Sequence, residues 1–308
     1  MTTRSEPDRS RRDPGLDAIV RERRHLINLA YRLLGSLAEA EDAVQETCTR
    51  WYAMSRRERD AIESPGAWLT TVAGRVCLNL LGSARVRRET YVGEWIPEPL
   101  PDGTAADPAD RVTLDESVGM AFLVVLESLT PAERVAFVLH DVFCHPFADV
   151  AEIVGRTPAA CRQLASSARR RIRAARPSPA APAGRSAGVV RDFKRAWEAK
   201  DIGALIALLD PDATAVADGG GLAATFPRPI EGAEQVARAW VELAHRRPGT
   251  TVLLERTVNG QPGLVARQDG AVVTVFAFDV AFDVAGDRIK RIWVIRNPDK
   301  LRHWGAVP

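Results

Sequence analysis

The hydrophobic pattern of this 308-residue chain changes class once, near residue 187. Before that point apolar residues recur every three or four positions, which predicts helices. After two or three further helices, alternating segments such as "TTVLLERTV" and "RIKRIWVIR" predict strands. Two proline-rich segments, "GEWIPEPLPDGTAADPAD" and "RPSPAAPAGRSAG", predict linkers. We therefore expect a multidomain fold: two all-α domains followed by one α+β domain.

The expected division of the chain follows these breaks, and a length of 308 residues suits more than one domain. We expect a flexible tail over residues 1–15, a helical domain over 16–92, a linker over 93–113, a second helical domain over 114–176, a linker over 177–187 and the α+β domain over 188–308.

Charge is distributed unevenly, although the net charge is only +2. Arginines cluster in "RVRR" and "RRRIRAAR", and such local basic patches favour nucleic-acid binding. No apolar run is long enough to span a bilayer and the polar N-terminus lacks a targeting signal, so we expect a cytoplasmic protein. Four widely spaced cysteines in apolar helical patterns are expected to be reduced core thiols: Cys48, Cys77, Cys144 and Cys161.

The segment "HPFADVAEIVGRTPAACRQLASSARRRIRAA" predicts a helix-turn-helix. Gly155 ends the first helix, Thr157 suits the N-cap and Pro158 suits the first position of the second helix. Second helices of this kind enter the DNA major groove, where Arg and Gln read base edges and Ser and Arg bind phosphates. The alternative is a basic, solvated helix end in a bundle. The candidate DNA-binding residues here are Thr157, Arg162, Gln163, Ser166, Ser167, Arg169 and Arg170.

Beyond this motif, the chain resembles a known family. "LTPAERVAFVLHDVFCHPFADVAEIVGRTPAACRQLASSARRRIR" is similar to the promoter-binding domain of extracytoplasmic-function (ECF) sigma factors. "SLAEAEDAVQETCTRWY" and "SPGAWLTTVAGRVCLNLLGSARVRRE" resemble the other conserved sigma domain. The resemblance implies a non-enzymatic initiation factor that binds core RNA polymerase and promoter DNA, without a cofactor or metal. A conventional helix-turn-helix activator or repressor is the alternative.

The resemblance also assigns roles to residues in the first helical domain. It implies that an acidic helix docks on the largest polymerase subunit, whereas the residues alone favour a solvated face. The polymerase-binding candidates are Glu41, Asp42, Gln45 and Glu46. A basic stretch would recognise the start-proximal promoter element and hold its melted strand; its candidates are Arg75, Asn79, Arg85, Arg87 and Arg88.

The third domain resembles SnoaL-like domains, which share a cone-shaped α+β fold with nuclear transport factor two (NTF2). Some relatives are enzymes, and others bind small molecules or protein partners. Acid–base catalysis in the cone would need a buried polar group, for which the candidates are Asp218, His245, Asp279, Asp283 and His303. We favour a non-catalytic domain, with a small ligand in it as an open alternative.

Three short segments, "WIPEP", "DGGG" and "NPDKL", resemble the signatures of sigma factors that carry a fused SnoaL-like domain. The resemblance implies that the third domain regulates the sigma domains of its own chain, with inhibition and activation both open. We hypothesise that the stiff segment 95–99 docks near the 218–221 loop, where glycines permit close approach. The interdomain candidates are Trp95, Ile96, Pro97, Asp218, Gly219, Gly220, Gly221, Asn297, Pro298 and Asp299.

Overall fold

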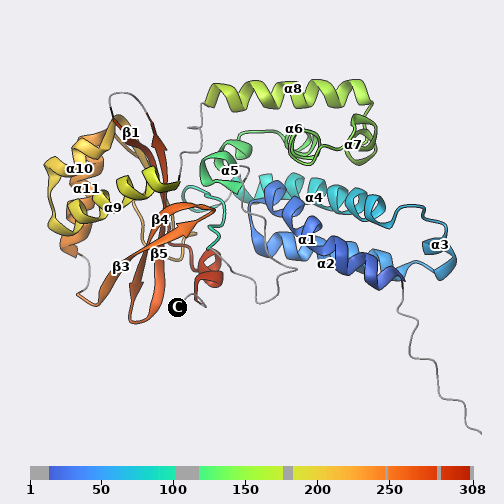
Figure 1. Cartoon of the computed structure of the whole chain (residues 1–308), viewed down its shortest axis with the longest axis horizontal. Helices are drawn as coiled ribbons and strands as arrows, with labels where there is room; N and C mark the ends of the chain where they lie inside the picture. Colours follow the sequence, from blue (N-terminus) through green and yellow to red (C-terminus); the bar gives the residue numbers. More distant parts are fainter. Residues whose placement is uncertain are drawn as a thin grey trace, which may run out of the picture.

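The computed structural model describes residues 14–89, 91–101, 118–175, 183–246, 249–282 and 286–305. Helices α1 to α8 lie to the right in Figure 1, and the sheet with helices α9 to α11 lies to the left. The first group of helices lies within residues 14–89. It comprises α1 (Pro14–Leu34), α2 (Leu37–Ala53), α3 (Arg56–Asp60) and α4 (Pro65–Glu89).

The second group of helices contains the predicted helix-turn-helix. It comprises α5 (Met120–Glu127), α6 (Pro131–Phe137), the π-helix η3 (Val138–Val142), α7 (Phe147–Val154) and α8 (Pro158–Ala175). Gly155 ends α7 in the left-handed conformation with φ of 69°, and the Thr157 hydroxyl accepts a 3.2 Å hydrogen bond from the Ala160 amide. Turn and cap therefore form as the sequence predicts.

The two groups of helices share one hydrophobic core. Buried side chains of α1, α4 and α7 belong to a single cluster, with Leu26, Val76 and Val150 among them. Helix α4 approaches α7 closely at Gly74, where an added Cβ would lie 2.8 Å from the Ile153 Cγ2 methyl. The all-α parts are therefore packed against each other as one body.

The C-terminal part of the chain is an α+β domain built on a six-stranded sheet in the order β2-β1-β6-β5-β4-β3. Strands β1 and β6 pair in parallel, and every other neighbouring pair is antiparallel. Register shifts interrupt three of the pairings, and such bulges bend a sheet. The strands are β1 (Leu209–Asp218), β2 (Ile230–Glu231), β3 (Thr251–Val258), β4 (Gln261–Gln268), β5 (Ala271–Ala281) and β6 (Arg288–Ile295).

Both faces of this sheet are buried, because alternate residues of β5 and β6 enter two different clusters. Phe276 and Val294 pack under the three helices α9 (Ala183–Ala199), α10 (Ile202–Leu208) and α11 (Ala233–Arg246). Val275 and Trp293 face the opposite side, where they meet α5, the linker segment 95–101 and the C-terminal 3-10 helix η4 (Pro298–Trp304). The linker, α5 and η4 therefore cover part of this face of the sheet.

Ser36 caps α2: its hydroxyl accepts the Glu39 amide, and the carboxylate of the linker residue Glu98 accepts the Leu37 amide. One local expectation needs correction. Cys144 is exposed and lies in the turn before α7 with φ of 58°, because Pro146 prevents the helix from continuing. Cys77 and Cys161 are buried as expected, and Cys48 is half-buried.

None of the helices in the described part of the chain is long and apolar enough to cross a bilayer. The same residues contain no group of three or more His, Cys, Asp or Glu side chains placed to hold a metal ion.

Candidate functional site

Helix α8 presents most of the candidate DNA-binding side chains to solvent. Thr157, Arg162, Gln163, Ser166 and Arg170 are exposed. The guanidinium of Arg162 lies 5.4 Å from the centroid of the Phe147 ring, so a cation–π contact with α7 holds this arginine in place.

Two candidates on α8 are instead held by the protein. Arg169 forms two hydrogen bonds, of 2.6 and 3.1 Å, to the carboxylate of Asp141 in η3. Ser167 is half-buried and hydrogen-bonds to the Glu133 carboxylate. The charge of Arg169 is therefore already paired, which makes it a weaker phosphate ligand than Arg170 in this arrangement.

Helix α4 carries the other basic candidates. Arg75 and Asn79 are exposed, but the Arg75 guanidinium donates a 2.9 Å hydrogen bond to the Glu152 carbonyl in α7. The helix continues through Glu89. The side chains of Arg85, Arg87 and Arg88 lie outside the described residues.

The acidic candidates lie on one side of α2. Asp42, Gln45 and Glu46 are exposed and Glu41 is half-buried. Glu46 forms a 2.9 Å ion pair with Arg50 one turn later. Exposed pairs of this kind contribute little stability, so the carboxylates stay available to a basic partner.

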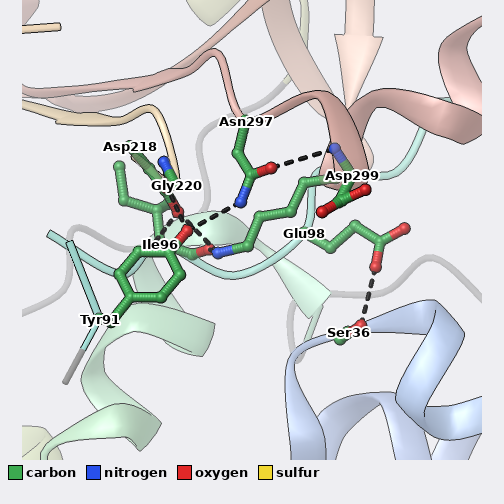
Figure 2. A network of polar contacts seen from close by, with 9 residues as sticks. Ser36, Tyr91, Ile96, Glu98, Asp218, Gly220, Asn297 and Asp299 are labelled. Carbon is green, nitrogen blue, oxygen red and sulfur yellow. Dashed lines mark hydrogen bonds and ion pairs between the residues drawn. The ribbon is translucent and has the colours of Figure 1, made fainter. Parts of the chain in front are cut away.

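The interdomain candidates meet around Asp218, which is fully buried at the end of β1 (Figure 2). Its Oδ2 atom accepts a 2.6 Å hydrogen bond from the Lys300 ammonium and a 3.0 Å bond from the Ile96 amide. Lys300 also donates to the Ile96 carbonyl. Both backbone groups of one linker residue are thereby bound by a charged pair in the α+β domain.

Tyr91 and Asn297 complete this network. The Tyr91 hydroxyl donates a 2.6 Å hydrogen bond to Asp218 Oδ1 and accepts a 2.8 Å bond from Asn297 Nδ2. Burial, together with the neighbouring Asp218 carboxylate, raises the pKa of Tyr91 above its usual value, so the phenol stays protonated and serves as a donor. Asn297 also caps η4, accepting the Asp299 amide at 3.0 Å.

The glycine loop packs tightly against the same network. A Cβ on Gly219 would overlap the Ala223 carbonyl, and one on Gly220 would overlap the Asn297 amide. Gly221, at φ of 73°, lies against Val92 of the linker. Pro97 and Trp95 pack over Gly35, which has φ of 70°. The Lys300 ammonium lies 4.1 Å from the Trp95 ring centroid, a cation–π contact.

Glu98 joins the linker to α2. Its Oε2 atom accepts hydrogen bonds of 2.8 Å from the Leu37 amide and 3.0 Å from the Ser36 hydroxyl, as Figure 2 shows for Ser36. Its Oε1 atom lies 3.5 Å from His303 Nε2. Burial raises the pKa of Glu98, whereas the Leu37 bond and His303 oppose that rise. This carboxylate therefore links η4 to the start of α2.

Asn259 provides a second contact between the α+β domain and the helical part of the molecule. It lies in the turn between β3 and β4 with φ of 51°. Its amide donates hydrogen bonds of 2.8 Å to the Tyr31 hydroxyl in α1 and 2.9 Å to the Val118 carbonyl, and its Oδ1 atom accepts one from the Leu100 amide.

Tyr91, Glu98, Asn259 and Lys300 were not singled out from the sequence. Glu98 and Lys300 lie within the "WIPEP" and "NPDKL" segments, so these motifs contained the signal. The dipeptide Asn259-Gly260 is a strong hairpin signal. The contacts that a turn residue makes outside its own hairpin cannot be predicted from the neighbouring residues.

The acid–base candidates of the α+β domain do not converge. His303 contacts Glu98, His245 is exposed at the end of α11, and buried Asp279 lies 3.9 Å from Arg291. Asp283 lies outside the described residues. Among those described, neither Asp218 nor any of these three lines the cavity that the domain contains.

Comparison with known proteins follows the same division of the chain. Residues 18–87 match sigma-70 region 2, and residues 119–172 match sigma-70 region 4. The ECF RNA polymerase sigma factor SigJ of Mycobacterium tuberculosis is 41% identical over 291 residues, which cover 91% of this chain and 90% of SigJ. The probable ECF sigma factor SigI of the same species is 35% identical over 298 residues, with coverage of 95% and 96%.

The solved structures extend the likeness to the whole fold. The crystal structure of M. tuberculosis SigJ matches with a TM-score of 0.73 at 37% identity, covering 94% of this chain and 98% of that one. A region 2, a region 4 with its helix-turn-helix and a fused α+β domain define a sigma factor with a C-terminal extension. The chain belongs to the ECF RNA polymerase sigma factors. The predicted fold class and the suspected family are thereby confirmed.

Proposed function

We propose that this sigma factor binds core RNA polymerase, directs it to promoters, and is regulated in cis by its α+β domain through the linker segment 95–99. The observation that carries the proposal is the Asp218–Lys300 pair, which binds both backbone groups of Ile96. This linker joins α4 to α5 and so connects the two DNA-reading parts. Holding it in one conformation holds their spacing.

The Asp218–Lys300 pair and the backbone groups of Ile96 that it binds, here called the linker latch, are buried: Asp218 is fully buried and Lys300 is 7% exposed. Release of Ile96 leaves the ion pair intact but deprives each of its charged groups of one hydrogen bond. A buried group that loses its hydrogen-bond partner costs about 1–3 kcal/mol, and more when it is charged. The linker is therefore released when a partner or ligand supplies comparable free energy.

The α4–α7 contact supports a regulated opening. Arg75 is a promoter-contact candidate, yet its guanidinium is bound to the Glu152 carbonyl. We infer that α4 and α7 move apart when Arg75 contacts DNA, and that the linker latch opposes or guides this movement. Since the partners are RNA polymerase and promoter DNA, we also infer a cytoplasmic location.

The test is run-off transcription with sigma-free core polymerase. Its templates carry a promoter selected from a random library, and the spacing between the two recognised elements is varied one base pair at a time. We expect the full chain to prefer one spacing and Asp218→Asn to lose that preference several-fold, because the neutral amide no longer pairs with Lys300.

The matched control is Asp212→Asn, an exposed aspartate on the same strand, which we expect to leave the preference unchanged. An identical spacing preference in Asp218→Asn and the unaltered chain would overturn regulation through the linker. No transcript from the unaltered chain with core polymerase would overturn the sigma activity itself.

A second function, small-molecule binding by the α+β domain, is favoured by one observation. A cavity of about 580 Å³ lies between α11 and the helix-covered face of the sheet. This volume falls in the range of small-molecule sites. Because the described acid–base candidates lie elsewhere, we propose that the domain binds a ligand without converting it.

A further inference from the structure

The cavity of the α+β domain is lined mainly by apolar side chains, with polar side chains among them. Trp197, Phe226, Leu253 and Phe276 line it from a helix, a loop and two strands. The polar and charged residues of the lining are Thr225, Glu242, Arg246, Thr251, Gln268, Thr274 and Arg296. An apolar body with a single polar head would match this distribution.

Two buried polar atoms in this lining have no hydrogen-bond partner among the described residues: Arg296 Nε and Thr251 Oγ1. A buried donor that stays unpaired costs free energy, so such atoms call for an explanation. Of the two arginines in this lining, Arg246 pairs with Glu242, and no ion pair of the described residues includes Arg296. The part of the cavity at Arg296 is therefore suited to an anion.

We infer that this cavity binds an amphipathic small molecule with an apolar body and an anionic head group of the carboxylate class. Arg296 binds the head through its Nε–H. A charge-assisted hydrogen bond to guanidinium is stronger than a neutral one, so the head decides affinity and the apolar walls add to it. This part of the inference is independent of the transcriptional proposal.

Arg296 also connects the cavity to the linker latch. Its guanidinium donates to the Ala224 carbonyl, and its backbone amide donates a 2.7 Å hydrogen bond to the Asp218 carbonyl. The next residue is Asn297, which binds Tyr91. Residues 224–226 of the glycine-loop segment line the cavity themselves.

An anion bound at Arg296 Nε shifts the guanidinium whose Nη1 donates to the Ala224 carbonyl, and this shift loosens the loop that packs on the linker. Ligand binding would thus favour release of segment 95–99. This coupling rests on the proposed function, whereas binding itself does not.

The binding test uses the full chain and two matched dyes. Anilinonaphthalene sulfonate is apolar and anionic; N-phenylnaphthylamine has the same ring system without the sulfonate. We expect the anionic dye to bind about tenfold more tightly to the unaltered chain, measured by fluorescence titration, since one charge-assisted contact separates the two. Arg296→Gln should abolish that difference.

The control is Arg238→Gln, which removes an exposed arginine on the outer side of α11 that pairs with Glu234. It should leave both dyes unaffected. Equal affinity of the two dyes for the unaltered chain, or an anion preference that survives in Arg296→Gln, would overturn the proposed site.

The coupling test measures amide hydrogen exchange in residues 91–101 with and without the anionic dye. We expect exchange there to speed up several-fold on binding, with no change in α1. Dye binding that leaves this segment unchanged would overturn the coupling, while the binding site and the sigma activity would each stand on their own tests.

Discussion

Gly220 illustrates how a single residue without a side chain brings two parts of the molecule together. Its φ is 61°, and its α-carbon lies directly against the Asn297 amide that binds Tyr91 of the linker. Two separate costs would follow from a Cβ here: backbone strain in the left-handed region, and displacement of Asn297.

We predict that Gly220→Ala destabilises the chain by about 1–3 kcal/mol more than Gly270→Ala. Gly270 has φ of 84° but open space around it, so its substitution measures the backbone strain alone. Chemical denaturation followed by tryptophan fluorescence provides the comparison. Equal losses in the two variants would contradict a packing role for Gly220.

Lys300 is the second residue whose removal has a distinct expected result. Lys300→Met leaves the buried Asp218 carboxylate without its cation, and we expect a loss of about 3–5 kcal/mol. In the double variant with Asp218→Asn the uncompensated charge is gone, so the two losses should be clearly less than additive. A denaturation cycle of the four proteins measures this. Full additivity would mean that the pair contributes nothing as a pair.

At the scale of the element, the start of α2 depends on a residue 61 positions away in the sequence. The Glu98 carboxylate binds the Leu37 amide at the positive end of the helix, while burial raises its pKa. For an acid, a raised pKa in the folded state means that the folded state binds protons more tightly than the unfolded one. Its contribution to stability is therefore present at low pH and falls as pH rises through the window between the two pKa values.

We predict that Glu98→Gln removes this pH dependence. Relative to the unaltered chain, the variant should gain stability as pH rises above the ordinary glutamate range, because its neutral amide oxygen still accepts the Leu37 amide. Denaturation midpoints of the two proteins across mildly acidic to neutral pH test it. A constant difference between them at every pH would contradict a raised pKa for Glu98.

At the scale of the whole molecule, the α+β domain buries apolar residues of the linker and of α5. Ile96 of the linker and Met120 of α5 belong to the same cluster as Trp293 and Trp304. The helical body has its own core, which includes none of these four residues. Removal of the third domain should therefore leave that body folded and expose its linker.

We predict that a chain ending near residue 180 exchanges the amides of 91–101 at least about tenfold faster than the full chain, while α1 keeps its protection. Run-off transcription by the same two proteins then shows whether release raises or lowers activity. If both proteins protected the linker equally, the third domain would have no role in ordering it.

The sequence by itself determined the elements and their order. Helical and alternating patterns, the Gly155 turn, the Thr157 cap and the strands of the sheet depend on residues a few positions apart, and local steric and hydrogen-bonding preferences suffice to predict them. The family resemblance added the link between segments 95–99 and 218–221, which the structure brings into contact.

Only the tertiary structure decided what each buried face and polar group meets. Hydrophobic periodicity identifies the face of α4 that is buried. It does not identify Ile153 of α7 as the side chain that packs against Gly74. Lys300 reads as an ordinary surface lysine until burial pairs it with Asp218, 82 positions earlier. The same holds for Asn259, which reaches Tyr31 across 228 positions. The physical reason is that such contacts form only when folding brings distant residues together and removes water from both. The residues next to each partner in the sequence do not determine which distant residue it meets.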